Sequence, residues 1–217
     1  TLTIDAVNGG ASDDGDGGAN NIDGGAGNDS IVGGADAETI LGGAGDDQIV
    51  GGGGNDTLNG GDDNDVVSAG GADAVTIIGG AGNDTLTGSS SGDVITGDAG
   101  NDVINGGDGP DTIDGGADDD DINGGAGADS ILGGDGNDTL TGGAGVDTLE
   151  GETGTADVVD YSGAAAGVTV DLTADAATDD GDGASDVITD GTEVVIGSGH
   201  NDSLTGEATA TRLEGGA

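Results

Sequence analysis

The chain has 217 residues, of which 54 are glycine and one is proline, and 45 Asp and Glu residues face a single basic residue, giving a formal charge of −44. Cys, Met, Trp and Phe are absent, which excludes a disulfide framework, a cysteine-ligated zinc site and a core of interlocking aromatic side chains. A field this negative repels nucleic acid and anionic membranes and attracts hard cations, of which calcium best suits carboxylate and carbonyl oxygens.

The composition also bears on location. No apolar run is long enough to span a bilayer, so we expect no membrane insertion. The chain has neither an initiator Met nor a signal peptide, and we therefore expect it to be part of a longer protein. The absence of Cys neither proves nor excludes an extracellular home.

Residues 1–23 form an incoming, cap-like segment that ends in a degenerate repeat, Gly15–Asp23. From Gly24 to Asp160 the sequence then has a period of nine, beginning with "GGAGNDSIV". We count 15 nonapeptides in frame, with Ala69 inserted and the last repeat stretched by one residue. Position eight is always aliphatic and position six is acidic in 14 of the 15. Such a self-similar period outweighs local propensity in assigning a fold.

Each repeat divides into a turn and a strand. The glycine-rich hexad turns tightly, because glycine tolerates positive φ and lets backbones approach closely. The last three residues, such as "SIV" or "TLT", favour a short β-strand in which position eight faces inward and positions seven and nine face outward. Two nonapeptides complete a flattened coil, and coils stack at about 4.8 Å, so the aliphatic residues form two ladders across a thin core.

This pattern resembles the RTX (repeats-in-toxin) calcium-binding family, whose motif is GGxGxDxUx with U large and aliphatic. The match covers 24–160, well over half of the chain. The resemblance implies an all-β fold, a right-handed parallel β-roll, with calcium ions held between successive turns at each edge. It also implies that the ligands are position-six carboxylates of adjacent turns and backbone carbonyls of turn residues such as Gly42, Gly45, Gly124, Gly127, Gly133 and Gly136.

The spacing of the acidic residues agrees with this arrangement. Turns alternate between two edges, so aspartates on one edge recur every 18 residues, or 19 across an insertion. Carboxylates stacked at about 4.8 Å repel one another, and a divalent cation between each pair converts repulsion into coordination. The expected calcium carboxylates are Asp29, Asp47, Asp56, Asp65, Asp84, Asp93, Asp102, Asp111, Asp120, Asp129, Asp138, Asp147 and Asp157.

Several repeats depart from the motif. "GGADAETIL" and "GGADAVTII" both lose the fourth glycine and replace the position-six aspartate, by Glu38 and Val75. Val75 cannot ligate calcium and Glu38 is one methylene too long, so we expect missing or weak calcium around both. "GSSSGDVIT" and "GGADDDDIN" also lack the fourth glycine but keep Asp93 and Asp120, and we expect these sites to survive.

After Asp160 the strict period is lost. Residues 161–196 form a non-repeat β segment in which "VTVDL" alternates as a strand does, and Tyr161, the one aromatic residue, is expected to pack over the end of the roll. Residues 197–217 restart the nonapeptide block with "GSGHNDSLT". The stretch 168–188 aligns without gaps to 2–22, at an offset of 166, so we interpret the chain as roughly one unit of a tandem series.

Two further motifs match known functional sites only in part. "GSSSG" fits a serine nucleophile elbow, but it occupies turn positions in frame, and His200, the one histidine, lies in another segment. We therefore expect no catalytic residues and no enzyme activity. "DDGDG" occurs twice without completing an EF-hand, which leaves open a loop carboxylate cluster that binds an additional calcium ion.

Two functions remain open. The first is a structural module that binds several calcium ions and folds outside the cell, within a large secreted or surface bacterial protein such as an adhesin, surface-layer or matrix filament. The alternative is the C-terminal secretion and folding domain of a type I-secreted exoenzyme, a lipase or metalloprotease. The recurrence at both ends favours the first, and open coil ends make end-to-end self-association an expected partner interaction. A mineral- or ice-binding surface would need regular outward Thr, whereas positions seven and nine are mixed.

Overall fold

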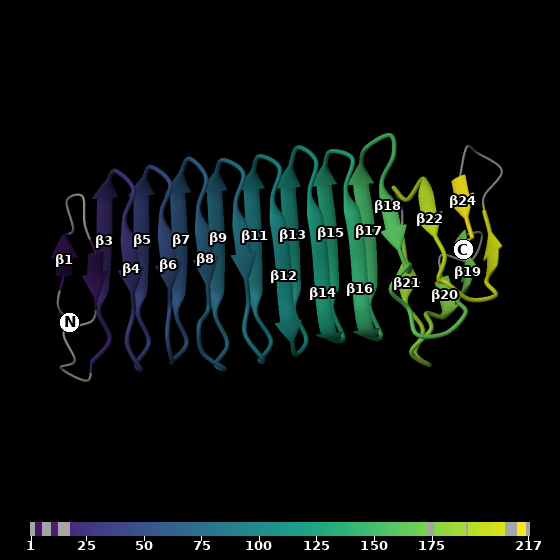
Figure 1. Cartoon of the computed structure of the whole chain (residues 1–217), viewed down its shortest axis with the longest axis horizontal. Helices are drawn as coiled ribbons and strands as arrows, with labels where there is room; N and C mark the ends of the chain where they lie inside the picture. Colours follow the sequence, from purple (N-terminus) through teal and green to yellow (C-terminus); the bar gives the residue numbers. More distant parts are fainter. Residues whose placement is uncertain are drawn as a thin grey trace.

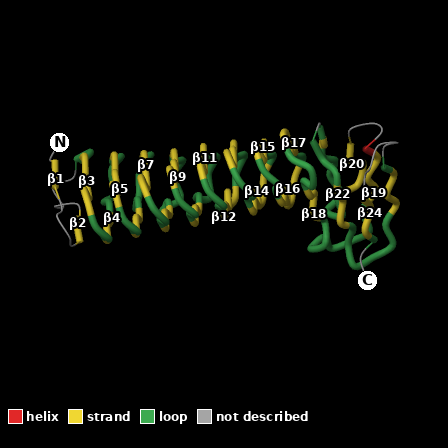
Figure 2. Tube along the Cα trace, turned by 90° about the horizontal axis from the view of Figure 1, so that it is seen from above, coloured by secondary structure: helices red, strands yellow, loops and turns green. Residues whose placement is uncertain are grey.

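The computed structural model describes residues 3–5, 10–12, 18–172, 176–189, 191–206 and 212–215. Almost all of its regular structure is β-strand, and the strands up to β18 stack in chain order into an elongated two-sheet solenoid (Figure 1). Seen from above, the regular turns repeat along the long axis until the C-terminal segment, where the path becomes irregular (Figure 2). The described residues contain no helix that is both long enough and apolar enough to cross a membrane.

The chain alternates between two sheets, as the nonapeptide pattern predicts. The first sheet has the strand order β1 (Thr3–Asp5), β3 (Asn21–Ala26), β5 (Thr39–Ala44), β7 (Thr57–Asp62), β9 (Thr76–Ala81), β11 (Val94–Ala99), β13 (Thr112–Ala117), β15 (Ser130–Asp135), β17 (Thr148–Thr153), β21 (Val187–Ile188), β20 (Ala176–Asp179), β19 (Thr169–Asp171) and β23 (Ser203–Thr205). The second sheet has the order β2 (Gly10–Ser12), β4 (Ser30–Val32), β6 (Gln48–Val50), β8 (Val66–Ser68), β10 (Thr85–Thr87), β12 (Val103–Asp108), β14 (Asp121–Gly127), β16 (Thr139–Gly145), β18 (Val158–Asp160), β22 (Val194–Ile196) and β24 (Arg212–Glu214). Neighbouring strands are parallel throughout the regular stack, so the fold is a parallel β-roll.

The core consists of the position-eight side chains. Ile31 pairs with Ile49 in the second sheet, and Ile40 pairs with Leu58 in the first, so each aliphatic residue lies directly above its counterpart one coil earlier. All of these side chains from Ile31 to Val159 are buried. This confirms the two facing ladders expected from the sequence, with no aromatic side chain inside the regular stack.

In most repeats positions two and four adopt positive φ, which explains why glycine is common at both. Gly43 and Gly45, for example, have φ of 118° and 115°. A Cβ on Gly43 would also collide with the carbonyl oxygen of Gly25 in the preceding coil. Glycine is therefore required both by the dihedral angle and by the close stacking of turns.

Three of the repeats that lack a fourth glycine have altered turns, whereas Asp63 and Asp118 keep positive φ at this position. Asp36, Asp73 and Ser91 stand at position four without positive φ, and the strands that precede their turns, β4, β8 and β10, are only three residues long. Strand β6 is equally short because both of its neighbours, β4 and β8, stop early and leave nothing to pair with an extension. In the later coils β12, β14 and β16 extend to six or seven residues.

The stack changes character after β18. Strand β21 takes the place after β17, and β20 pairs antiparallel with both β21 and β19 before β23 returns to parallel pairing. The N-terminal counterpart of β19 at the offset of 166 residues is β1, which instead pairs directly with β3. The first "DDGDG" copy, at 13–17, lies outside the described residues, as do parts of the last block, at 207–211 and 216–217.

Candidate metal-binding edges

The position-six side chains form a buried ladder along each edge of the roll. We name these ladders the Asp29 edge and the Asp56 edge. The Asp29 edge carries Asp29, Asp47, Asp65, Asp84, Asp102, Asp120, Asp138 and Asp157. The Asp56 edge carries Glu38, Asp56, Val75, Asp93, Asp111, Asp129 and Asp147. Every one of these side chains is at most 5% exposed, although thirteen of them are aspartates and one is a glutamate.

One oxygen of each aspartate has a fixed partner. The backbone N–H of the position-six residue one coil earlier donates to Oδ1, as Asp84 does to Asp102 at 2.7 Å and Asp111 does to Asp129 at 2.8 Å. The same hydrogen bond recurs between 2.7 and 3.0 Å along both edges. The carboxylates are therefore aligned coil by coil, with the spacing of 18 or 19 residues that the sequence predicts.

The other oxygen lacks a donor at most rungs. Among the residues that the structure describes, no N–H or O–H reaches the buried Oδ2 atoms of Asp47, Asp56, Asp65, Asp84, Asp102, Asp111, Asp120, Asp129, Asp138, Asp147 and Asp157. A buried polar atom without a partner costs free energy, and a buried charge costs far more. A repeated deficit of positive charge thus runs along both edges, and a cation would remedy it.

The position-one glycines border these oxygens. The place that a Cβ of Gly42 would occupy is flanked by Oδ2 of Asp47 and by the carbonyl oxygen of Gly60 in the next coil. Gly124 and Gly133 face Oδ2 of the aspartate in their own repeat in the same way, and Gly127 and Gly136 at position four face Oδ1. Gly45 borders the carbonyl of Gly27 and the side chain of Asn28 instead. Carboxylate and carbonyl oxygens thus converge at the turns, and this donor set fits calcium.

Burial raises the pKa of the ladder carboxyl groups. The pKa is raised to about 7 at Asp65, Asp111 and Asp120, chiefly by burial, with the neighbouring carboxylates adding to the rise and the backbone N–H opposing it. It is raised to about 6 at Asp56, Asp102, Asp147 and Asp157 for the same main reason. Without a counterion, these carboxyl groups therefore resist ionisation.

The predicted departures are all local. Val75 is buried and donates its N–H to Oδ1 of Asp93, so the Asp56 edge lacks one carboxylate between Asp56 and Asp93. Glu38 accepts the N–H of Gly34 in its own turn at 3.1 Å through Oε2.

The carboxylate of the repeat "GSSSGDVIT" has hydrogen-bond donors that we did not expect. Ser89 at position two donates its N–H to Oδ2 of Asp93 at 2.6 Å and its hydroxyl to Oδ1 at 3.2 Å, so both oxygens of Asp93 have donors.

Two acidic residues beyond the last regular repeat extend the ladders, and the sequence reasoning missed them. Asp147 donates its N–H to Oδ1 of Asp186 at 3.0 Å, and Asp157 donates its N–H to Oε2 of Glu193 at 2.9 Å. Each is followed two residues later by a buried aliphatic residue, Ile188 or Val195, as in the repeat. This acid-x-aliphatic triplet is the signal that could have identified them.

The donor set also limits what can bind. Within the described ranges, no group of three or more His, Cys, Asp or Glu side chains is placed to hold a metal ion. Neighbouring rungs contribute two carboxylates per step, so backbone carbonyls and water would have to complete any coordination shell.

Ser90 and His200, the residues of the serine-elbow signal, are both exposed in separate turns.

The family assignment agrees with this geometry. The family model described as RTX calcium-binding nonapeptide repeat (4 copies) matches residues 14–49, 41–73, 67–95, 76–104, 96–131, 123–155 and 187–217, which together make up most of the chain. No curated protein matches the chain. From the two-sheet roll, the buried carboxylate ladders and these matches, we conclude that the chain belongs to the RTX calcium-binding nonapeptide repeat family and is a calcium-binding repeat module.

Proposed function

We propose that this module folds when it binds calcium outside the cell, as a structural part of a large secreted or surface bacterial protein of the adhesin, surface-layer or matrix filament type. The observation that carries the proposal is the pair of buried ladders whose Oδ2 atoms lack donors. In a chain with a formal charge of −44, no basic side chain is available to neutralise them, since the single one, Arg212, pairs with Glu214.

The proposed ligands are the thirteen predicted aspartates, together with turn carbonyls. Asp186 and Glu193 join them, because each continues a ladder by the same backbone hydrogen bond. Calcium supplies the positive charge that adjacent carboxylates need in order to lie side by side in their ionised form. We expect weaker binding beside Val75, which has no carboxylate, and at Asp93, whose two oxygens already accept hydrogen bonds from Ser89.

Ligand binding then controls folding. At the submicromolar calcium of a cytosol, mutual repulsion keeps the chain expanded and ready for export. At roughly millimolar extracellular calcium, every bound ion adds its binding free energy to the stability of the roll. RTX repeats are typical of secreted proteins, which supports this placement, and type I secretion follows from the same family resemblance.

The ends of the roll support end-to-end self-association. Strands β1 and β2 are outermost at one end of the two sheets, and β23 and β24 are outermost at the other. A parallel strand at the end of a stack presents backbone donors and acceptors to another chain. The offset repeat of 166 residues supports the further proposal that such units follow one another in tandem.

The experiment that tests the folding switch is a calcium titration of EDTA-treated protein, followed by far-UV circular dichroism. We expect a cooperative change from coil to β-structure with calcium, and no such change with magnesium at the same concentration. A β-rich spectrum that EDTA leaves unchanged would show that the coil stack holds itself together, and would refute the switch.

A further inference from the structure

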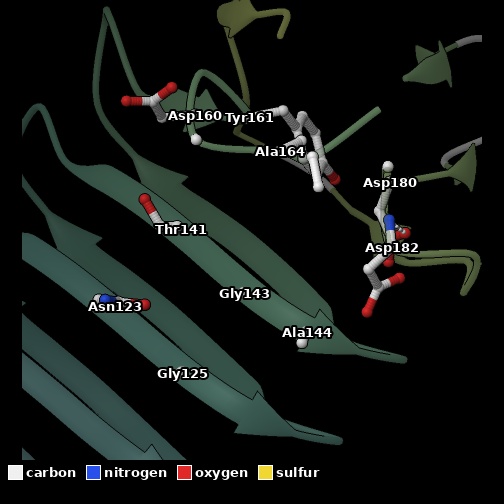
Figure 3. Close-up of a pocket in the computed structure, with 13 residues that line it drawn as sticks. Asn123, Gly125, Thr141, Gly143, Ala144, Asp160, Tyr161, Ala164, Asp180 and Asp182 are labelled. Carbon is white, nitrogen blue, oxygen red and sulfur yellow. Dashed lines mark hydrogen bonds between the residues drawn. The ribbon is translucent and has the colours of Figure 1, made fainter. Parts of the chain in front are cut away.

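A cavity of about 420 Å³ lies where the non-repeat segment folds back over the roll (Figure 3). Its floor is the outer face of β14 and β16, including Thr141 and Gly143. Its walls come from Tyr161 and from the loop that contains Asp180 and Asp182. The cavity thus lies between the last complete coil and the second "DDGDG" run, at 179–183.

This loop docks onto the roll through a carboxylate. In most turns of the regular stack the N–H of the fourth glycine donates to a carbonyl one coil later, as Gly27 does to Ala44 and Gly136 does to Thr153, although Gly54 donates to Oδ2 of Asp73. Gly145 is the last residue of β16, and its N–H donates at 2.9 Å to Oδ2 of Asp182 instead. The side chain of Asp182 therefore stands in for the carbonyl of a following turn.

Asp180 is the anomalous residue of the loop. It is 3% exposed, and its Oδ1 accepts the N–H of Asp182 at 3.0 Å and that of Ala184 at 3.3 Å. No donor in the described part of the chain reaches its Oδ2 atom, which is buried. Figure 3 shows the side chains of Asp180 and Asp182 close together at one end of the cavity. The buried carboxylate of Asp180 and the exposed carboxylate of Asp182 thus meet at a site whose lining residues include no basic side chain.

We propose that Asp180 and Asp182 bind a further calcium ion in this cavity, outside the nonapeptide ladders, and that the ion fastens the non-repeat segment to the last coil of the roll. This proposal and the proposed function both concern calcium, but the cavity site lies outside the ladders and does not depend on the ladder sites. Calcium suits the site better than magnesium, because it accepts an irregular shell of carboxylates, carbonyls and water, whereas magnesium demands near-ideal octahedral geometry.

The test uses Tyr161 as a local reporter. Terbium replaces calcium in oxygen-ligated sites, and its emission is sensitised by a nearby tyrosine. Tyr161 is the only aromatic residue of the chain and lines the same cavity, and its hydroxyl donates to Oδ2 of Asp186 at 2.9 Å. The tyrosine-sensitised signal therefore reports ions in the cavity and also at the neighbouring ladder rung of Asp147 and Asp186. In the full 217-residue chain we expect a terbium signal that calcium displaces and equimolar magnesium does not.

Two variants separate the cavity from the ladders. Asp182→Asn keeps an oxygen acceptor for Gly145 but loses a ligand charge, and we expect it to weaken sensitised terbium binding by about tenfold. The double variant Asp180→Asn/Asp182→Asn should lose the part of the signal that Asp147→Asn, which weakens the neighbouring rung, leaves in place. The matched control is Asp179→Asn, which removes one charge from the same run and should bind terbium like the parent chain.

The outcomes distinguish this site from the neighbouring rung. A signal that survives in the double variant and is lost in Asp147→Asn places the ion on the Asp56 edge and overturns the proposal. Absence of any tyrosine-sensitised signal in the parent chain also overturns it. Circular dichroism in calcium confirms that each variant is folded. If the roll proves to be folded without calcium, the folding switch fails, while the terbium experiment still decides whether the cavity binds an ion.

Discussion

At the scale of single residues, the turn positions explain most of the sequence constraint. Positions two and four adopt positive φ in most repeats, and glycine does so without strain. Among the residues that the structure describes, four other than glycine adopt the same conformation, with φ between 65° and 77°: Asp63, Asp98, Asp118 and Glu152. A side chain in this region costs about 1–2 kcal/mol, which aspartate lowers through local hydrogen bonding.

We therefore predict that Asp118→Gly stabilises the calcium-bound roll by about 0.5–1 kcal/mol, since relief of the left-handed strain exceeds the extra chain entropy of glycine. Asp118 is exposed and has φ of 77°. The measurement is the free energy of unfolding by urea in saturating calcium.

The matched control for this substitution is Asp36→Gly. Asp36 is exposed, stands at the same position of another repeat and lacks positive φ, so the substitution should destabilise the roll by about 0.5–1 kcal/mol through chain entropy alone. Equal effects of the two substitutions would mean that loss of charge, and not backbone strain, decides the stability.

At the scale of elements, the period of nine was enough to predict each coil. Position eight faces inward and position six lies on the edge in every regular repeat, because the strand alternates and the turn length is constant. The sequence alone therefore yields the two sheets, the core ladder and the spacing of the carboxylates. The prediction that Val75 breaks the Asp56 edge follows from the same frame.

Other features depend on contacts that a period cannot show. Asp186 follows its ladder partner Asp147 by 39 residues, and Glu193 follows Asp157 by 36 residues. The spacing departs from 18 or 19 because the antiparallel strands β19 and β20 are inserted in between. Ser89 donates to Asp93 in a turn that lacks positive φ at both Ser89 and Ser91. Both cases concern turn geometry, which the spacing of residues does not specify.

Substitution of a single ladder aspartate tests whether the ladder binds calcium, because the expected change in stability has opposite signs with and without the ion. We predict that Asp102→Asn stabilises the β-structure without calcium, because it removes a buried charge between Asp84 and Asp120 and keeps the acceptor for the N–H of Asp84. In saturating calcium it should destabilise the roll, by about 1.4 kcal/mol for each tenfold loss of ion affinity. Urea unfolding with and without calcium measures both effects.

The control for the rung is Asp121→Asn on the exposed face of β14. It removes the same charge next to the neighbouring rung without touching the ladder, and it should change the stability by less than about 0.5 kcal/mol in either condition. If Asp102→Asn shifts stability in the same direction with and without calcium, the rungs are not ion ligands.

At the scale of the whole molecule, two parallel rows of buried carboxylates run along the roll, and we expect the protonation or ion binding of these carboxylates to control its stability. The hydrophobic core is a single aliphatic side chain per strand, and the charge is −44. Folding without an ion therefore places a buried carboxylate row on each side of a thin core. Calcium and protons are the two species that can neutralise these rows from solution, and they should act in place of one another.

We predict that acid folds the roll when calcium is absent. The pKa of the ladder groups is raised from 3.8 in the free side chain to about 6 or 7 in the folded roll, so the folded state binds more protons than the unfolded state. The resulting stability is fully present below about pH 4 and is lost as the pH rises through 6 to 7. Far-UV circular dichroism in EDTA should show β-structure near pH 4 and coil near pH 8.

Salt separates protonation of the ladders from general screening. At pH 8 in 1 M sodium chloride the Debye length falls to about 3 Å, which screens exposed carboxylates but leaves the buried rungs ionised. High salt in EDTA should therefore leave the chain unfolded, whereas acid or calcium folds it. β-structure that appears in salt alone would mean that overall repulsion controls folding, and unfolding of the EDTA-treated chain by acid would contradict the raised pKa values.

With calcium present, the roll should stay folded from pH 4 to pH 8. It should release protons on binding the ion between pH 6 and 7, because the ion displaces the protons that the ladder carboxyl groups otherwise hold.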